Sequence, residues 1–450
     1  MADTVTSVSD SRDGIGQRAA AQLVVALECD RPLAGSTRHL LEGTAEVRIG
    51  RGDRRAVRSV DAGVRRLELA IPDRNMSTAH ARLVAVRGRW VLDDAGSKNG
   101  CLVNGAAVDR AVLLDGDLIE LGHTLLLYRD AVAVAEPARP DFDGATGLAP
   151  TFVAELARSL SALAKVARGT VAATIVGARG GGHQTIARAL HAASGRAGAF
   201  VVVPCGPLAP ALDGATLIEL LRSADRGTLL IDDLGALPRD AQTVLLRVLE
   251  RQVVLPAGSA RPIAVTVRVV AASPRPLDDR VDAGELDRDL AARMSELAVT
   301  VPSLAERVVD LGLLIGAALR THAGAPPPAI AVRAARALFR HAWPLDVSEL
   351  DRALSTALAL SERGTIRLEH LPEAVRRAGG ALDGTPRPAA TGHEPLHPET
   401  EAQRLRVELV ALLEQHAGNV SAVAKTMGKG RMQIHRWLKR FELELASFRK

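Results

Sequence analysis

The 450-residue sequence has few aromatic residues, three cysteines and no long apolar run. Aromatic residues are 2% of the chain, which argues against a protein that stacks single-stranded bases on aromatic side chains. Cys29, Cys101 and Cys205 are far apart, so they predict neither a disulfide framework nor a metal site. No stretch has the roughly eighteen apolar residues of a membrane span, and the first twenty residues lack a signal-peptide core. We therefore expect a soluble, cytoplasmic protein.

What the chain does contain is enough apolar sequence for several cores. Hydrophobic residues make up 47% of it, and a chain of this length is expected to form about three domains. The net charge is only +5, so the positions of the charges matter more than their sum. We divide the chain into a tail (1–21), a β-rich segment (22–132), a linker (133–150), alternating strands and helices (151–304), a helical segment (305–377), a second linker (378–400) and a helical end (401–450). This pattern predicts a multidomain protein with a β-sandwich, a parallel α/β sheet and an all-α end.

The β-rich segment carries a series of loop motifs in a fixed order. They are Gly50-Arg51, 77–80 (STAH), 94–100 (DAGSKNG), Asn104-Gly105, 115–117 (DGD) and Gly122. In order, spacing and identity, these motifs resemble a forkhead-associated (FHA) domain over about 110 residues. The resemblance implies a β-sandwich whose loops bind a phosphothreonine peptide from a kinase pathway.

The resemblance also implies which residues bind that peptide: Arg51, Ser77, Thr78, Lys98 and Asn99. A phosphothreonine carries close to two negative charges and three acceptor oxygens. Arg51 offers a planar fork of donors, and Ser77 adds a hydroxyl donor. Thr78 and Lys98 would flank the phosphate, Asn99 would hold the peptide backbone, and His80 would brace the loop. We expect phosphate binding to be retained, the alternative being a sandwich that has lost it.

The central segment contains a glycine-rich loop at 177–184 (GARGGGHQ) and, further on, an apolar strand that ends in Asp232-Asp233. These segments resemble the phosphate loop and the Walker B strand of the AAA+ activators of sigma-54 RNA polymerase, over roughly residues 150–375. The resemblance implies a P-loop-type α/β domain followed by a helical lid. It places a degenerate nucleotide site on Gly177, Gly180, Gly181, Gly182, His183, Gln184, Asp232, Asp233 and Arg293.

Five positions depart from the active site of that family. His183 stands where a lysine would reach the phosphates as a point charge, and an imidazole is mostly neutral at cytoplasmic pH. Asp233 replaces the glutamate that positions water, and Pro274 replaces the sensor asparagine. Asp287 replaces the first arginine finger, and Ser348 the second sensor arginine. Because catalytic parts act as a unit, we expect no catalytic residues, no ATP hydrolysis and no required cofactor.

Two further points concern ligands of this domain. The segment 206–226 is about half as long as its counterpart in the family, and the missing stretch holds the GAFTGA loop that touches the sigma factor. Direct contact with sigma-54 is therefore not expected. ATP binding without turnover stays open, since the loop glycines could still present backbone donors at a helix N-terminus; the alternative is a flexible loop in a retained scaffold.

The C-terminal segment is predicted to form three short helices with turns at Gly418-Asn419 and 428–430. It resembles the Fis-type helix-turn-helix that ends many sigma-54 activators. Between 418 and 441 there are six Lys or Arg residues and no acid, which is typical of a duplex-DNA binder. The predicted DNA-binding residues are Lys425, Lys429, Arg431, Gln433, His435, Arg436, Lys439 and Arg440. A motif of this size binds weakly alone, so we expect a homo-oligomer, at least a dimer.

Three functions compete on the sequence alone. The favoured one is a transcription regulator that senses phosphothreonine, binds double-stranded DNA and carries an AAA+ scaffold without ATPase activity. The second is an ATP-hydrolysing sigma-54 activator. The third is a phosphopeptide-binding adaptor in kinase signalling.

Overall fold

The computed structural model describes residues 19–134, 139–145, 147–205, 212–256, 258–259, 261–324, 326–362 and 364–380, together with Val420 and Thr426. By their contacts, residues 1–387 form one compact unit and residues 388–450 a second. The predicted DNA-binding residues between Lys425 and Arg440 lie outside the described residues, so the helix-turn-helix remains a prediction.

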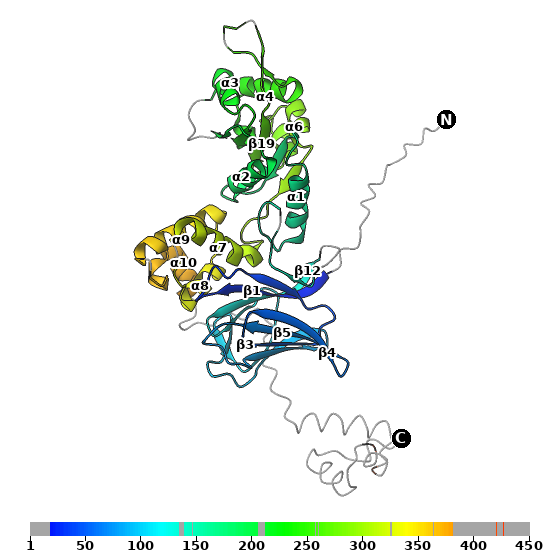
Figure 1. The fold of residues 1–450 in the computed structure, drawn as a ribbon, viewed down its shortest axis with the longest axis vertical. Helices are drawn as coiled ribbons and strands as arrows, with labels where there is room; N and C mark the ends of the chain where they lie inside the picture. The colour runs from blue at the N-terminus through cyan, green and yellow to red at the C-terminus, as the bar shows by residue number, and fades with distance from the viewer. Residues whose placement is uncertain are drawn as a thin grey trace, which may run out of the picture. The chain divides into compact units, whose positions relative to one another are not determined.

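The N-terminal part of the first unit is a sandwich of two sheets (Figure 1). One sheet has the order β13-β2-β1-β12-β11-β8-β9, and the other has the order β10-β7-β6-β3-β5-β4. Their strands are β1 (Ala19–Glu28), β2 (Thr37–Leu40), β3 (Glu46–Arg51), β4 (Arg55–Asp61), β5 (Val64–Ile71), β6 (Ala81–Val86), β7 (Arg89–Asp94), β8 (Cys101–Val103), β9 (Ala106–Val108), β10 (Arg110–Val112), β11 (Leu118–Leu121), β12 (Thr124–Ala133) and β13 (Asp141–Phe142). Alternate residues such as Val47, Ile49, Leu67 and Leu69 fill the space between the sheets. The predicted sandwich is confirmed.

The stretch 133–150, predicted as a linker, contributes a strand to this sandwich. β13 pairs with β2, and Asp141 accepts hydrogen bonds from His39 Nδ1 at 2.7 Å and from Arg58 Nε at 2.9 Å. Burial raises the pKa of the Asp141 carboxyl, but the His39 and Arg58 contacts outweigh it and hold that pKa below its ordinary value. Charge pairing therefore anchors a segment whose composition suggested only a connection.

The central part is an α/β domain around a parallel sheet of order β15-β16-β19-β14-β20. Its strands are β14 (Ala173–Val176), β15 (Phe200–Pro204), β16 (Thr228–Asp232), β19 (Arg268–Ser273) and β20 (Ala298–Thr300), with a small ribbon of β17 (Val253–Val254) and β18 (Ile263–Ala264). Its helices are α1 (Ala154–Lys165), α2 (His183–Ser194), α3 (Gly214–Ser223), η1 (Leu234–Ala236), α4 (Arg239–Arg251), α5 (Leu277–Asp282) and α6 (Arg288–Met294). Continuous apolar strands buried on both faces explain this fold, and the predicted α/β class is confirmed.

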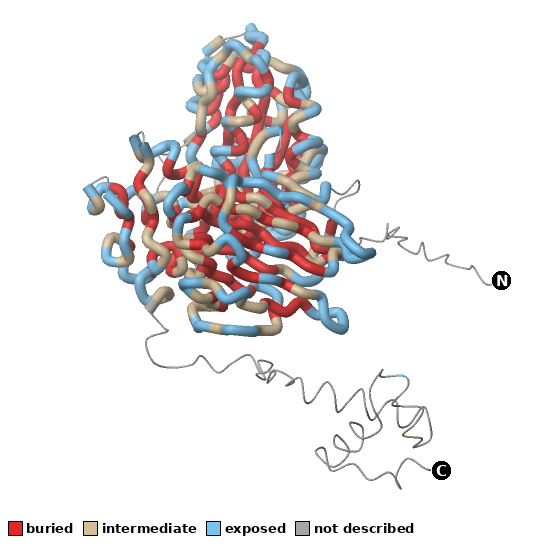
Figure 2. Tube along the Cα trace, turned by 60° about the horizontal axis from the view of Figure 1, so that its bottom comes forward, coloured by how far each residue is buried: buried red, intermediate tan, exposed pale blue. Residues whose placement is uncertain are grey.

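A helical lid follows the sheet. It consists of η2 (Val308–Asp310), α7 (Leu311–His322), α8 (Val332–Arg340), α9 (Asp346–Leu360), η3 (Leu368–His370) and α10 (Glu373–Gly380), so its last helix runs into the stretch 378–400 predicted as a linker. The lid shares its core with one sheet of the sandwich. Val24, Leu27 and Leu125 of the sandwich share one buried cluster with Ile315 and Leu338 of the lid. In Figure 1 the lid helices α7 and α8 lie beside β1. Figure 2 draws the buried residues of the sheets in red.

Candidate functional site

The five residues predicted to bind a phosphopeptide lie on loops at one end of the sandwich. Arg51 ends β3, and its backbone N–H donates to Ser77 O at 2.9 Å. The Ser77 hydroxyl accepts from the Lys98 backbone N–H at 3.0 Å. Asn99 Nδ2 donates to Asn75 O at 2.8 Å. A Cβ at Gly50 would lie 1.8 Å from Thr78 O, so only glycine allows this close approach of the loops.

His80 fixes the relative position of two of these loops. Its ring is fully buried, Nδ1 accepts from the Ser77 backbone N–H at 3.0 Å, and Nε2 lies 3.0 Å from Gly100 O. A carbonyl can only accept, so the neutral ring carries its proton on Nε2. Arg51, Thr78, Lys98 and Asn99 are exposed above this support, as binding of an external ligand requires.

Two carboxylates that sequence reasoning left without a role complete the support. Asp73 is buried and accepts from the Asn75 N–H, the His123 N–H and the Thr124 hydroxyl at 2.7–2.8 Å. Asp94 accepts from the backbone N–H and hydroxyl of Ser97. Burial raises the pKa of Asp94, but the Ser97 hydrogen bonds outweigh it and keep that pKa below its ordinary value. Asp94 opens the loop motif 94–100, whereas Asp73 gave no signal beyond its place after a proline.

The second candidate site is the glycine-rich loop between β14 and α2. Gly180 and Gly182 have φ values of 86° and 91°, which favour glycine. The lid holds this loop directly: Ser348 N–H donates to Gly180 O at 3.0 Å, and Arg307 Nη2 donates to Gly181 O at 2.9 Å. A Cβ at Gly180 would lie 2.5 Å from Ser348 Oγ. Ser348, predicted to stand in place of the second sensor arginine, thus packs the lid on the loop.

His183 begins α2 and is 8% exposed. Burial lowers the pKa of His183, the carboxylates of Asp232 and Asp346 oppose this effect, and Arg307 reinforces it. Its Nε2 has no hydrogen-bond partner among the described residues. An imidazole with a lowered pKa is neutral near pH 7, so it supplies no fixed positive charge to a bound phosphate.

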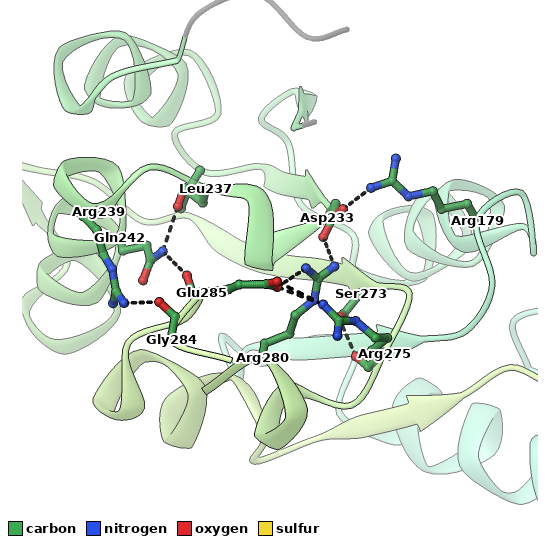
Figure 3. Close-up of polar contacts among 10 residues, drawn as sticks. All are labelled: Arg179, Asp233, Leu237, Arg239, Gln242, Ser273, Arg275, Arg280, Gly284 and Glu285. Carbon is green, nitrogen blue, oxygen red and sulfur yellow. Dashed lines mark hydrogen bonds and ion pairs between the residues drawn. The ribbon is translucent and has the colours of Figure 1, made fainter. Parts of the chain in front are cut away.

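Asp232 and Asp233 end up in different surroundings. Asp232 is exposed at the end of β16, whereas Asp233 is 5% exposed and has a φ of 78°. Figure 3 shows the Asp233 carboxylate between two guanidinium groups. Arg280 Nη2 donates to it at 2.7 Å, and Arg179 of the glycine-rich loop also pairs with it. Nothing in the local sequence pattern identified either arginine as its partner.

The remaining candidates of this domain make other contacts. Asp287, which the sequence predicts to stand in place of an arginine finger, caps α6 by accepting from the Asp289 and Leu290 N–H groups. Arg293 is half exposed on α6, with Nη2 3.9 Å from Glu250 Oε1. Gln184 is exposed on α2, and a Cβ at Gly177 would lie 2.6 Å from Val301 O.

The space at this site is small. A cavity of about 130 Å³ is lined by Arg179, Gly180, His183, Cys205, Asp232, Asp233, Ala272, Ser273 and Pro274. Pockets that hold drug-sized ligands have roughly 300–1,000 Å³. In the stretch 206–226, the described part contains α3. In the part of the chain that the structure describes, no group of three or more His, Cys, Asp or Glu residues could hold a metal ion, and no helix is long and apolar enough to cross a membrane.

Comparison with known families assigns each of these parts. The sigma-54 interaction domain model matches residues 152–300, the FHA domain model matches 47–122 and the AAA+ ATPase lid domain model matches 305–385. The anaerobic nitric oxide reductase transcription regulator of Aeromonas hydrophila is 30% identical over 361 residues, which cover 72% of this chain and 69% of the relative. The chain belongs to the sigma-54-dependent transcriptional regulators.

Other members of this regulator family match over a smaller share of their length. The acetoin catabolism regulatory protein of Cupriavidus necator is 31% identical over 312 residues, 65% of this chain but only 46% of that protein. The chain therefore spans about half the length of this relative. Among solved structures, NtrX from Brucella abortus in complex with ATP is 26% identical, with a TM-score of 0.44 and coverage of 66% of this chain and 69% of the other. By the family models, this chain combines an FHA domain with a sigma-54 interaction domain and an AAA+ ATPase lid domain.

Proposed function

We propose that this chain regulates transcription by binding double-stranded DNA through residues 401–450 and a phosphothreonine-containing protein through its FHA domain. Its AAA+ domain acts as a scaffold that does not hydrolyse ATP, and the protein works as a homo-oligomer, at least a dimer. Direct contact with sigma-54 is not part of the proposal, because the segment 206–226 lacks the length of the contacting loop.

One observation carries the sensing role: Arg51, Ser77 and Asn99 are brought to adjacent loops whose geometry is already fixed. Ser77 is hydrogen-bonded to both neighbouring loops, through its carbonyl to Arg51 N–H and through its hydroxyl to Lys98 N–H. The Arg51 side chain stays exposed. A dianionic phosphate would therefore meet donors that need little rearrangement, which is the condition for tight binding at small entropic cost.

The scaffold role is supported by how the catalytic positions are used. Asp233 is committed to Arg280 and Arg179, His183 is buried with a lowered pKa, and Asp287 caps a helix. A carboxylate that is hydrogen-bonded to two guanidinium groups is not free to orient an attacking water. Arg307 and Ser348 of the lid donate hydrogen bonds to the backbone carbonyls of the glycine-rich loop.

DNA binding is proposed from sequence alone. The six Lys or Arg residues between 418 and 441, unaccompanied by acids, supply the charge that contacts phosphates. Of the predicted DNA-binding residues, Arg431, Gln433 and His435 would face base edges. Arg436, Lys439 and Arg440 would contact the phosphates of the DNA backbone.

The sensing role is tested by fluorescence anisotropy of the full chain with a phosphothreonine peptide library and its unphosphorylated counterpart. Arg51→Ala should weaken phosphopeptide binding by about 10- to 150-fold, which is the range expected for the loss of a hydrogen bond to a charged group. Exposed Arg55 in the next strand is the matched control, and Arg55→Ala should leave binding unchanged. Equal binding of both peptide pools would refute the sensing role.

The other two roles need separate measurements. ATP turnover by the purified chain should equal background, and Asp232→Ala should not alter it; a rate that Asp232→Ala abolishes would make the chain an active ATPase instead. Duplex binding measured by filter retention should fall steeply with salt. A flat salt dependence, with no transcript changed by deletion of 401–450, would favour the adaptor alternative.

A further inference from the structure

The loop that carries Arg51 is connected to the lid through Arg54. This arginine follows Arg51 by three positions, and its guanidinium donates to Ala34 O and Gly35 O, both at 2.6 Å. Nη1 of Arg54 also lies 2.9 Å from Oε1 of buried Glu28. The phosphothreonine loop is therefore tied to the turn between β1 and β2, residues 29–36.

Strand β1 and that turn both pack closely against α7. A Cβ at Gly312 would lie 1.8 Å from Ala26 O and 2.5 Å from Ser36 Oγ, and the Ser36 hydroxyl itself donates to Ala26 O at 2.7 Å. The turn also accepts a hydrogen bond from the lid, since Ile330 N–H donates to Cys29 O at 2.8 Å. A displacement of this turn is therefore transmitted to α7, because densely packed interiors do not absorb it.

The same helix leads to the glycine-rich loop. η2 precedes α7, and Arg307, directly before η2, donates to Gly181 O at 2.9 Å. Asp310 fixes the start of α7 by accepting from Thr151 Oγ1 and Phe152 N–H, both at 2.6 Å. These contacts, together with the chain segment 307–312, thus connect the Arg51 loop to Gly181.

We propose that phosphothreonine binding at the FHA loops is coupled to the glycine-rich loop through Arg54, Glu28 and α7. The bound phosphate, with close to two negative charges, competes with Glu28 for Arg54. Losing that contact loosens the turn 29–36 on α7 and releases Arg307 from Gly181. That a phosphothreonine ligand drives this coupling rests on the binding proposed above. The connection from Arg54 through α7 to Gly181 does not rest on it. A two-site effect of this kind requires one element that both sites bias, and α7 is that element.

The first experiment needs no ligand. Hydrogen–deuterium exchange of the full chain is compared among the wild type, Arg54→Ala and Arg55→Ala. Arg54→Ala should speed amide exchange about fivefold or more in 307–319 and 177–186, the low end of typical coupling. Arg55 is an exposed arginine at the start of the neighbouring strand, so Arg55→Ala should match the wild type. Equal exchange in the two variants overturns the coupling.

The second experiment adds a phosphothreonine peptide selected from the library. In the wild type it should speed exchange in 307–319 and 177–186, and in Arg54→Ala, which already lacks the contact, it should add little. Peptide binding with changes confined to 50–54, 74–80 and 95–100 overturns the coupling. If the wild type binds no phosphothreonine peptide, the sensing role fails, whereas the ligand-free comparison still decides whether Arg54 connects the loop to α7.

Discussion

Arg336 of α8 donates two parallel hydrogen bonds to Glu120 of β11, at 2.6 and 2.7 Å, although 216 positions separate them. Glu120 is 1% exposed, so its charge lies at the junction of sandwich and lid, away from water. Arg340 adds a hydrogen bond to Asn104 O at 2.6 Å. A bidentate arginine–carboxylate pair, which requires a specific geometry, therefore joins the sandwich to the lid.

Arg336→Ala should destabilise the folded chain by about 3–5 kcal/mol, because it leaves Glu120 buried without its charged partner. The measurement is the free energy of unfolding in urea. Arg352→Ala, at an exposed position of α9 in the same lid, serves as the control and should change it by less than about 0.5 kcal/mol. Similar values for the two variants would mean that Glu120 is hydrated in solution.

Gly312→Ala should open the contact between the sandwich and the lid. The added methyl would lie 1.8 Å from Ala26 O, so the backbone must move, at a cost of about 3 kcal/mol or more. Gly316 is one turn along α7, and a methyl added there would lie 3.5 Å from its nearest neighbour, Pro32 O. Gly316→Ala should therefore be neutral or stabilise the helix by up to about 1 kcal/mol. Thermal unfolding of both variants checks the contrast, and equal melting temperatures would contradict it.

Stability should depend on pH through Asp310. Burial raises the pKa of this carboxyl from 3.8 to about 6, although the Phe152 and Thr151 hydrogen bonds act to lower it. A raised carboxyl pKa means that the folded state binds the proton more tightly. Its stabilising effect is complete below the unfolded pKa and is lost as pH rises through about 6, by about 3 kcal/mol at most.

Asp310→Asn should remove this dependence, since an amide does not titrate. Unfolding free energies of the variant and the wild type, measured from about pH 4 to pH 7, should diverge in favour of the variant as pH rises. Asp278→Asn, at an exposed position of α5, should keep the wild-type slope. Parallel curves for wild type and Asp310→Asn would show that Asp310 does not titrate in this range.

The two arginines on Asp233 should differ in their contribution to stability. Arg280 is 9% exposed and Arg179 is 64% exposed, while both pair with the same buried carboxylate. Arg280→Ala should cost about 3–5 kcal/mol, since the paired charge is buried. Arg179→Ala should cost about 1 kcal/mol or less, since water screens an exposed arginine. Urea unfolding distinguishes them, and a larger effect of Arg179→Ala would mean that the glycine-rich loop closes further over Asp233 than in this structure.

The sequence indicated candidate sites most directly where the loops contain the small and turn-forming residues that set their own conformation. Arg51, Ser77 and Asn99 lie within motifs of small and turn-forming residues, and the positions of such motifs in a sandwich follow from strand order. The same reasoning reached Gly180, His183 and Asp233, which belong to the loop and strand end of a parallel sheet.

The partners of these residues were not predictable in the same way. Arg54 and Arg280 belong to no local motif, and Arg307 ends a motif, 301–307, that assigned it no partner. An arginine in a sequence of this composition is equally consistent with a solvated surface. Their roles follow from contacts across long separations, such as Arg307 to Gly181 and Arg280 to Asp233. Composition also misjudged 141–142, which form β13 rather than part of a free linker, because His39 and Arg58 supply charge pairing from elsewhere in the chain.

The sequence by itself determined the class of the sandwich, the α/β domain and the lid, because strand alternation, helix periodicity and glycine-rich turns are local properties of a chain. Only the tertiary structure decided that the sandwich and the lid share one core, that Glu120 meets Arg336, and that the lid holds the glycine-rich loop through Arg307 and Ser348. These contacts depend on how separately formed surfaces fit together, and shape and charge complementarity between distant segments leave no periodic trace in the sequence.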